Sequence, residues 1–190
     1  MIILVRHHES ASRLISSLTY SFHSGRYSLD NVLRETLAEC ITVLEKDQSD
    51  KSISLFEVKD DILQIRDGIR ISAESVVKRT FEKGTGFAGS VWEKGEAEYI
   101  NNIDYEGDPR FNHEEHYFPK RNRFKSMMGI PLQVDEQIIG VLCIQSESED
   151  GFCADDLRAL EFYANLCTFM MLYDKIGLNT KGSEDNDSSK

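Results

Sequence analysis

One stretch, Lys83 to Asp156, constrains the fold of this 190-residue chain more than any other. It opens with a glycine-rich turn at residues 83–89 and ends just before a long apolar segment. In between, two apolar runs, 125–133 and 137–146, are separated by a short turn, which predicts an antiparallel pair of strands. Because Ile138 to Ile144 is almost wholly apolar, we expect a central strand covered on both faces. The stretch therefore predicts a layered sheet followed by a helix.

Helical periodicity predicts helices at both ends of the chain. Residues 8–22 and the segment after Ser28 place apolar side chains three or four positions apart, and Ser28 is a suitable N-cap. The strongest pattern covers 154–176 and carries two apolar stripes, whereas a helix that covers only its own sheet needs one. The second stripe predicts contact with the N-terminal helices or with a second copy of the chain.

The residues between these helices show strand-like patterns. We expect a hairpin from the runs 53–58 and 62–65, short strands at 76–81 and 97–100, and a short helix at 87–93. Residues 101–123 lack such a pattern, and irregular segments of this length in a compact domain are often functional. The expected organisation is a helical extension over 1–27, one domain over 28–176 and a disordered acidic tail over 177–190.

Composition excludes several classes of partner. The formal net charge of −11 argues against broad electrostatic binding to nucleic acid or to an anionic membrane. No run approaches the ~20 apolar residues that span a bilayer, and the apolar start, Met1 to Val5, is too short for a signal-peptide core. We therefore expect a cytoplasmic protein.

The order of several motifs resembles the GAF domain family. They are Gly84-Thr85-Gly86-Phe87-Ala88-Gly89, Asp104 with Asp108-Pro109-Arg110-Phe111, Ile130-Pro131-Leu132, Ile139-Gly140-Val141-Leu142 and Phe152 with Asp156-Leu157. The resemblance implies an α+β, GAF/PAS-like fold with a central antiparallel sheet of about six strands, helices on one face, and long N- and C-terminal helices. It also implies a small-molecule pocket on the other face, roofed by residues 101–124, and a dimer formed by the first and last helices.

Members of that family sense cyclic nucleotides, bilins, haem or small metabolites, and three departures narrow these options. Gln145-Ser146 stands where cyclic-nucleotide-binding members have Asn-Lys, so only Phe152 and Asp156 match that motif. Segment 101–124 contains no Cys for covalent attachment of a bilin. The redox cysteines that the free methionine sulfoxide reductases carry before the Pro-containing strand are also missing, which disfavours that activity.

The four cysteines predict no disulfide framework and no zinc site. Cys40, Cys143, Cys153 and Cys167 form no Cys-x-x-Cys pair, and three of them lie in apolar helical or strand patterns. We expect reduced thiols that behave as small hydrophobic side chains.

Three further patterns resemble functional motifs but are better explained without that function. His113-Glu114-Glu115-His116 lacks the i, i+4 histidine spacing of zincins, so a solvated turn is preferred over a metal site. The basic cluster Lys120 to Lys125 can clamp an anion or pair with nearby carboxylates, and surface pairing is the commoner case. Ile3 to Ser10 resembles the start of a histidine phosphatase, but His8 replaces the required Gly and the rest of the chain fits another fold.

We therefore expect a small-molecule-sensing regulatory domain with no catalysis, no metal and an unspecified ligand. The expected ligand contacts are Asp104, Arg110, Phe111, Tyr117, Phe118 and Met128. The expected partners are the ligand, a second copy bound through the N- and C-terminal helices, and an output-domain protein, with neither nucleic acid nor membrane. The alternatives are a protein–protein assembly module with a filled, ligand-free pocket, and a cysteine-based redox enzyme of the free methionine sulfoxide reductase type using Cys143 or Cys153.

Overall fold

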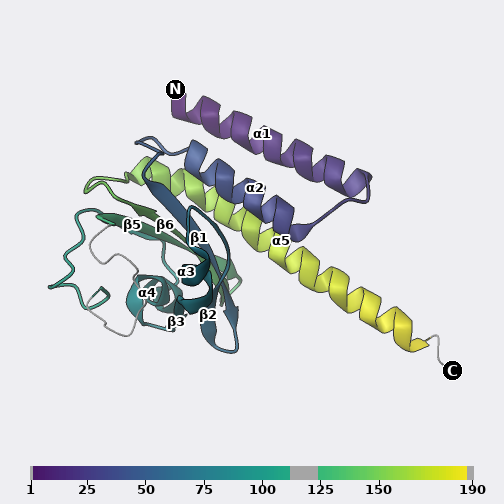
Figure 1. The fold of residues 1–190 in the computed structure, drawn as a ribbon. Coiled ribbons are helices and arrows are strands. Elements are labelled where there is room, and N and C mark those ends of the chain that lie inside the picture. The colour runs from purple at the N-terminus through teal and green to yellow at the C-terminus, as the bar shows by residue number, and fades with distance from the viewer. Residues whose placement is uncertain (1, 112–123, 188–190) are drawn as a thin grey trace.

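The computed structural model describes residues 2–111 and 124–187, which form a six-stranded sheet with helices on both sides (Figure 1). The helices are α1 (Ile2–His23), α2 (Leu29–Thr42), α3 (Ala73–Lys78), α4 (Gly86–Lys94) and α5 (Ala154–Asp187). The strands are β1 (Lys51–Lys59), β2 (Ile62–Ile69), β3 (Thr80–Glu82), β4 (Glu98–Ile100), β5 (Ser126–Val134) and β6 (Gln137–Ser146).

The sheet is antiparallel with the order β3-β2-β1-β6-β5-β4. The two hairpins, β1–β2 and β5–β6, meet along the central β1–β6 pair, where Leu55 lies opposite Leu142 and Phe56 lies opposite Val141. Successive residues of a strand point to opposite faces. Leu55 and Leu142 therefore face one layer of the protein, and Phe56 and Val141 face the other.

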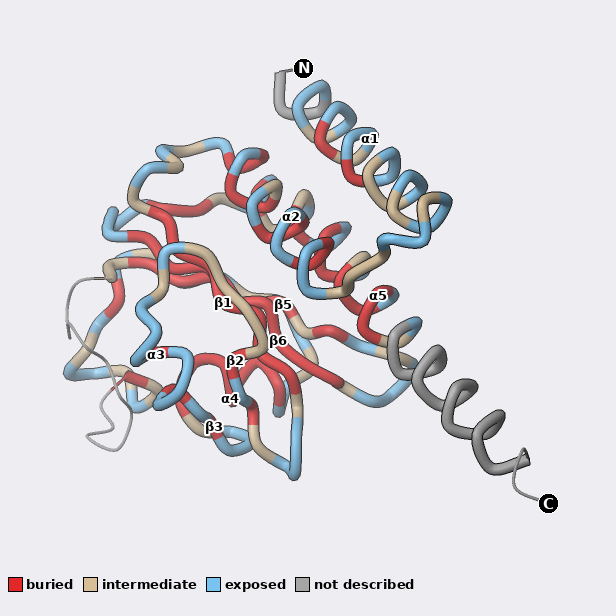
Figure 2. Tube along the Cα trace, turned by 45° about the vertical axis from the view of Figure 1, so that its right-hand side comes forward, coloured by how far each residue is buried: buried red, intermediate tan, exposed pale blue. Residues whose placement is uncertain are grey.

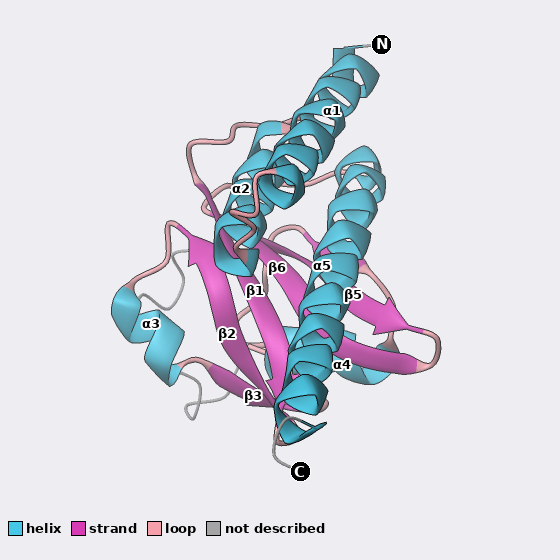
Figure 3. Cartoon of the chain, turned by 90° about the vertical axis from the view of Figure 1, so that its right-hand side faces the viewer, coloured by secondary structure: helices cyan, strands magenta, loops and turns pink. Residues whose placement is uncertain are grey.

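Helices α1, α2 and α5 cover the first face, here called the helix face. Helix α5 runs across the sheet, α2 lies beside it and α1 packs outside α2 (Figures 1 and 3). The buried layer is mostly aliphatic and includes Leu33, Leu37, Leu55, Leu142, Leu160 and Met171. This apolar face explains why α2 and α5 pack on the sheet, while α1 packs on α2.

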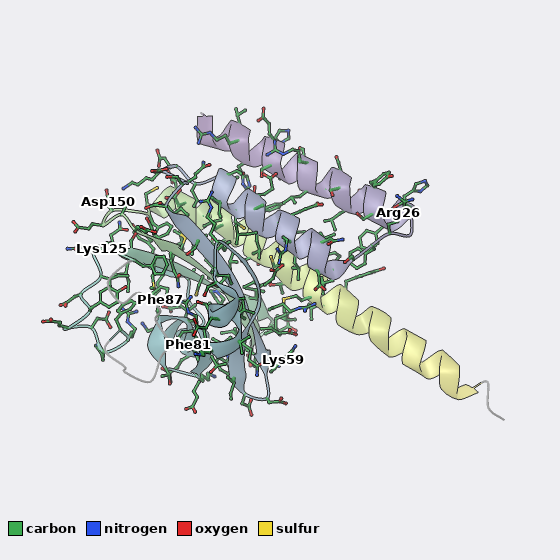
Figure 4. All side chains as sticks on the ribbon, viewed as in Figure 1. Arg26, Lys59, Phe81, Phe87, Lys125 and Asp150 are labelled. Atoms are coloured by element: carbon green, nitrogen blue, oxygen red, sulfur yellow. The ribbon has the colours of Figure 1, made fainter. Side chains whose placement is uncertain are left out.

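The opposite face, here called the roof face, carries α3, α4 and residues 101–111. Its buried layer is richer in aromatic side chains and includes Phe56, Phe81, Phe87, Trp92, Phe111 and Val141. Figure 4 shows Phe81 and Phe87 on this side of the sheet, and Figure 2 shows that the central strands are buried between the two layers. The central strand is thus covered on both faces, as the sequence predicts.

The predicted strand at 76–81 is wrong over most of its length. Residues 73–78 form helix α3, and only the short β3 follows. The hydroxyl of Ser72 accepts a hydrogen bond from the backbone N–H of Ser75 at 3.1 Å, which caps the helix. This cap outweighs the strand preference of Val76 and Val77.

Both terminal helices are longer than predicted. Helix α1 begins at Ile2, so the Ile3 to Ser10 stretch is helical and not the strand-to-loop start of a phosphatase. Helix α5 continues past Ile176 into the segment for which the sequence predicts disorder. Within the described residues, no helix combines the length and apolarity that crossing a bilayer requires.

Candidate functional site

Residues 103–111 return the chain to the roof face and bury one aromatic ring there. Phe111 is 2% exposed, and its ring centroid lies 6.0 Å from that of Phe87 and 5.6 Å from that of Tyr105. Tyr105 also donates a hydrogen bond from its hydroxyl to the carbonyl oxygen of Phe124 at 2.7 Å. Phe111 is therefore the anchor that holds this segment against α4 and the sheet.

Arg110 lies beside this anchor with its charge paired on both sides. Its Nη2 lies 2.7 Å from Oδ2 of Asp108, and its Nη1 contacts Glu98 of β4. The guanidinium carbon lies 5.7 Å from the Phe87 ring centroid and 5.8 Å from that of Phe111. The hydrogen bond from Arg110 lowers the pKa of Asp108, and the same bond raises the pKa of Arg110. The site thus combines a fixed, fork-shaped donor with two apolar ring faces.

The side chain of Asp104 stabilises the turn that precedes Arg110 and Phe111. Its Oδ1 accepts backbone N–H bonds from Glu106 at 3.1 Å and from Gly107 at 2.9 Å. A Cβ atom added at Gly107 would lie 2.2 Å from Oδ2 of Asp104, so a larger residue there would displace the Asp104 carboxylate. Asp104 therefore acts on the site through the backbone of its own turn.

The structure brings together only part of the predicted contact set. Arg110 and Phe111 lie side by side on the roof face, and Asp104 lies in the preceding turn. Met128 is fully buried in the layer of the helix face, whereas its neighbour Met127 belongs to the roof face. The assignment of Met128 to this site therefore misses by one residue, because successive strand residues alternate between faces. Tyr117 and Phe118 lie outside the described residues.

Sequence reasoning missed two charged side chains of this region, Glu98 and Arg79. Arg79 follows α3 and is 3% exposed, and its charge acts on the nearby Cys143. Burial raises the pKa of the Cys143 thiol to about 12, although Arg79 opposes that shift. The only sequence signal for Glu98 is its place in a short strand, and Arg79 has no signal because its neighbours are distant in the chain.

The remaining cysteines do not contribute to the roof face. Cys40 and Cys167 are fully buried in the layer of the helix face, where burial raises both thiol pKa values. Cys153 is partly exposed and donates a hydrogen bond to Glu45 at 3.2 Å. The predicted burial of the thiols is thus confirmed for Cys40, Cys143 and Cys167, whereas Cys153 is partly exposed.

The described part of the chain contains no cluster of three His, Cys, Asp or Glu side chains that could hold a metal ion. The stretch from His113 to His116 lies outside that part, as do residues 120–123 of the basic cluster. A surface hollow of about 520 Å³ does occur between the tips of the two hairpins. It is lined by Lys83, Trp92 and Ile138 among others, away from Arg110 and Phe111.

A second feature is an aromatic seam formed by α1, α5 and the loop after α1. It contains the exposed Tyr20, Phe22, Phe169 and Tyr173 and the partly buried Tyr27. Phe22 stacks on Tyr27 with ring centroids 4.5 Å apart, and Tyr173 meets Phe22 edge-on at 5.2 Å. Phe169 is 58% exposed and Tyr20 is 65% exposed. Large apolar patches of this kind on a folded domain mark interaction surfaces.

Comparison with known proteins identifies the fold. The family model of the GAF domain matches residues 27–171. The GAF domain of a phosphoenolpyruvate-protein phosphotransferase from Acinetobacter has a TM-score of 0.69 and 17% identity, over 88% of this chain and 93% of that chain. The corresponding domain from Coxiella burnetii has a TM-score of 0.68 and 17% identity, over 95% of this chain and 96% of that chain.

An enzyme shares the same fold. The type II free methionine-R-sulfoxide reductase from Thermoplasma acidophilum has a TM-score of 0.58 and 18% identity, over 75% of this chain and 94% of that chain. No match was found among curated proteins. At these identities the structural likeness shows the fold alone, and the family model, which covers most of the chain, shows the family. The chain belongs to the GAF domain family.

Proposed function

We propose that this protein is a regulatory GAF domain that binds a small molecule on the roof face and signals through α1 and α5, with no reaction of its own. The observation that carries the proposal is the pairing of Arg110 and Phe111. Arg110 supplies a fixed cation, and the buried ring of Phe111 holds that cation and its segment against the sheet. Binding sites combine apolar walls with a few placed polar groups in this way.

The charges around Arg110 indicate how a ligand would be recognised. Asp108 lies two residues away on the same turn, whereas Glu98 reaches Arg110 from β4. A ligand carboxylate or phosphate would replace Glu98 at Nη1, because a guanidinium binds such groups in the same planar geometry. Because Phe87 and Phe111 are 4% and 2% exposed, the apolar part of the ligand would reach their rings only when residues 103–111 shift away from α4.

The thiol chemistry supports regulation over catalysis. A cysteine enzyme needs a thiolate, and a pKa of about 12 leaves Cys143 protonated at neutral pH. Burial is also the main cause that raises the pKa of Cys153, the one partly exposed thiol. Four free cysteines fit a reducing compartment, which supports a cytoplasmic location.

The aromatic seam supports an output through protein contacts. We propose that it forms a homodimer interface along α1 and α5, and that an output-domain protein reads the dimer geometry. Replacing Phe169 by Glu would place a charge in the seam without touching the buried core. Sedimentation analysis is expected to show a dimer for the wild-type protein and a monomer for this variant.

Native mass spectrometry tests the binding proposal. The purified wild-type protein is expected to carry a co-purified small molecule that is absent from its denatured mass. Arg110→Ala and Phe111→Ala should lose that molecule, whereas Arg158→Ala, which removes an exposed arginine paired with Asp155, should retain it. A wild-type protein without any adduct, whose melting temperature no metabolite raises, would contradict the proposal.

That contrary outcome would favour a second function, an assembly module with a filled pocket. The observation behind it is that Phe56, Phe81, Phe87 and Phe111 already fill much of the roof face. In that case the seam alone would carry the function, and Phe169→Glu would abolish it without any ligand being involved.

A further inference from the structure

We propose that Asn101 is a positioning residue that couples the segment at Arg110 and Phe111 to the start of α5. The coupling itself does not depend on the proposed function. Only its role, carrying a ligand signal from the roof face to α5, rests on that proposal. The coupling would explain how an event on the roof face reaches helices on the opposite face. Its basis is a set of contacts between the residues that flank this segment and the loop 147–153, here called the junction loop.

Asn101 binds the junction loop through both Nδ2 and Oδ1 of its side-chain amide. Its Nδ2 donates to the carbonyl oxygen of Phe152 at 2.9 Å, and its Oδ1 accepts from the N–H of Phe152 at 3.2 Å. Nδ2 also donates to Oδ1 of Asp150 at 2.9 Å. Only a side-chain amide offers a donor and an acceptor in this spacing, so neither Ala nor Asp can replace it.

Backbone hydrogen bonds of Asn102, Ile103 and Lys125 add to this attachment. The N–H of Asn102 donates to Glu149 at 2.7 Å, and the N–H of Ile103 donates to Lys125 at 2.8 Å. The N–H of Lys125 in turn donates to Ser146 at the end of β6, also at 2.8 Å. Lys125 and Asp150 lie at the same end of the molecule in Figure 4. Residues 101–103 and Lys125 therefore meet next to the junction loop.

The junction loop is held firmly on its sheet side. Oδ2 of Asp50 accepts from the hydroxyl of Ser146 at 2.6 Å and from the N–H of Ser148 at 3.0 Å. The buried Lys51 bridges Asp50 at 2.8 Å and the hydroxyl of Ser146 at 2.9 Å. A Cβ atom at Gly151 would lie 2.2 Å from Oγ of Ser126, so the loop also packs closely on β5. A displacement at Asn101 is thus transmitted along this loop, since the loop has little freedom to absorb it.

The other end of the junction loop is the first turn of α5. Asp156 is 2% exposed, and its Oδ2 accepts from the N–H of Cys153 at 2.9 Å. Its Oδ1 accepts from the N–H of Glu45, just after α2, at 2.7 Å. The contact between α5 and the end of α2 is therefore made by Asp156, four residues beyond Phe152, and Asp156 is itself bonded to the residue that follows Phe152. A shift of Phe152 changes how both helices meet.

Hydrogen exchange of the ligand-free protein tests the coupling by a double-mutant cycle. Phe111→Leu loosens the anchor on the roof face. In the wild-type background it is expected to speed exchange of backbone amides in residues 153–160 by about fivefold, as local openings do. In the Asn101→Ala background the same substitution should change those amides less than about twofold. Amides of residues 103–111 should respond to Phe111→Leu in both backgrounds.

Matched controls separate coupling from general loosening. Asn102→Gly changes the neighbouring residue, whose φ of +52° glycine accepts, and it should leave the fivefold response intact. Tyr105→Phe, which removes the bond to Phe124, supplies a milder second perturbation should Phe111→Leu unfold the protein.

Two results would overturn the proposal. One is a wild-type background in which neither perturbation reaches residues 153–160. The other is an equal response of residues 153–160 to Phe111→Leu with and without Asn101. That result would mean that the coupling passes through the sheet. Because no ligand enters the experiment, an empty native mass spectrum would defeat the proposed function and leave this result standing.

Discussion

The two faces of the sheet are covered by different kinds of side chain. The helix face is aliphatic and is covered by the long helices α2 and α5. The roof face is aromatic, includes the buried Arg79 and the thiol of Cys143, and is covered by two short helices and residues 101–111. The long helices are held by many buried side chains at once, whereas the irregular segment depends on single anchors such as Phe111. The comparison indicates that the helix face supplies stability and the roof face supplies the part that can change.

Two fully buried leucines on adjacent strands provide the largest test of this comparison. Leu55 faces the helices and Leu63 faces the roof, so Leu→Ala removes the same atoms from each layer. We expect Leu55→Ala to lower the free energy of unfolding by about 4 kcal/mol and Leu63→Ala by about 3 kcal/mol, because a less rigid layer collapses more fully around a cavity. Denaturant titration of both variants measures the difference. A larger loss for Leu63→Ala would reverse the assignment of the two faces.

Helix α4 tests whether the roof face can be disturbed alone. A Cβ atom at Gly89 would lie 2.3 Å from the carbonyl oxygen of Glu82, so Gly89→Ala pushes α4 away from β3. We expect a loss of about 2 kcal/mol from this overpacking. Hydrogen exchange should rise in α4 and β3 while α2 and α5 keep their protection.

A second glycine gives the control for that variant. Gly25 has a φ of +65°, and no atom lies within 4 Å of the point where a Cβ atom would stand. Gly25→Ala therefore reports backbone strain alone, at about 1 kcal/mol. Equal losses in the two variants would show that α4 is not overpacked at Gly89, and loss of protection throughout α5 in Gly89→Ala would show that the two layers respond together.

The sequence predicts the layers better than it predicts the site. Periodicity locates the terminal helices and the central hairpins because burial of one face demands it. It does not distinguish Met127 from Met128, since a strand buried on both faces is apolar at every position. Asn101 carries no signal at all, because its partner Phe152 lies in another part of the chain and the contact exists only in the fold. Site residues that act through distant contacts therefore escape pattern reasoning.

The network around Asp50, which joins the sheet to the junction loop, predicts an effect of pH. Burial opposes ionisation, but hydrogen bonds from Lys51, Ser146 and Ser148 lower the pKa of Asp50 from 3.8 to about 2. A lowered folded-state pKa means that the stabilisation is present above about pH 4 and is lost as the pH falls toward 2. We expect a loss of about 1 kcal/mol over this range, since the group is partly solvated.

Denaturant titrations at several pH values measure this step for the wild-type protein and for Asp50→Asn, which should lack it. Asp61→Asn is the control, because Asp61 lies in the exposed β1–β2 turn and asparagine accepts its φ of +58°. A step of unchanged size in Asp50→Asn would place its origin in another carboxylate.

The labelling rates of Cys143 and Cys167 compare the two faces in the wild-type protein, without any substitution. The pKa of Cys143 on the roof face and that of Cys167 on the helix face are both raised to about 12 by burial. Since burial is the main cause of both shifts, each thiol reacts only when its layer opens and exposes it, and the difference in labelling rate reports how often each layer opens. We expect N-ethylmaleimide to modify Cys143 about fivefold faster than Cys167, with the partly exposed Cys153 faster than both. Peptide mass spectrometry of a labelling time course separates the three sites. Equal rates for Cys143 and Cys167 would mean that both layers open only when the whole domain unfolds, and the roof face would then be no more adaptable than the helix face.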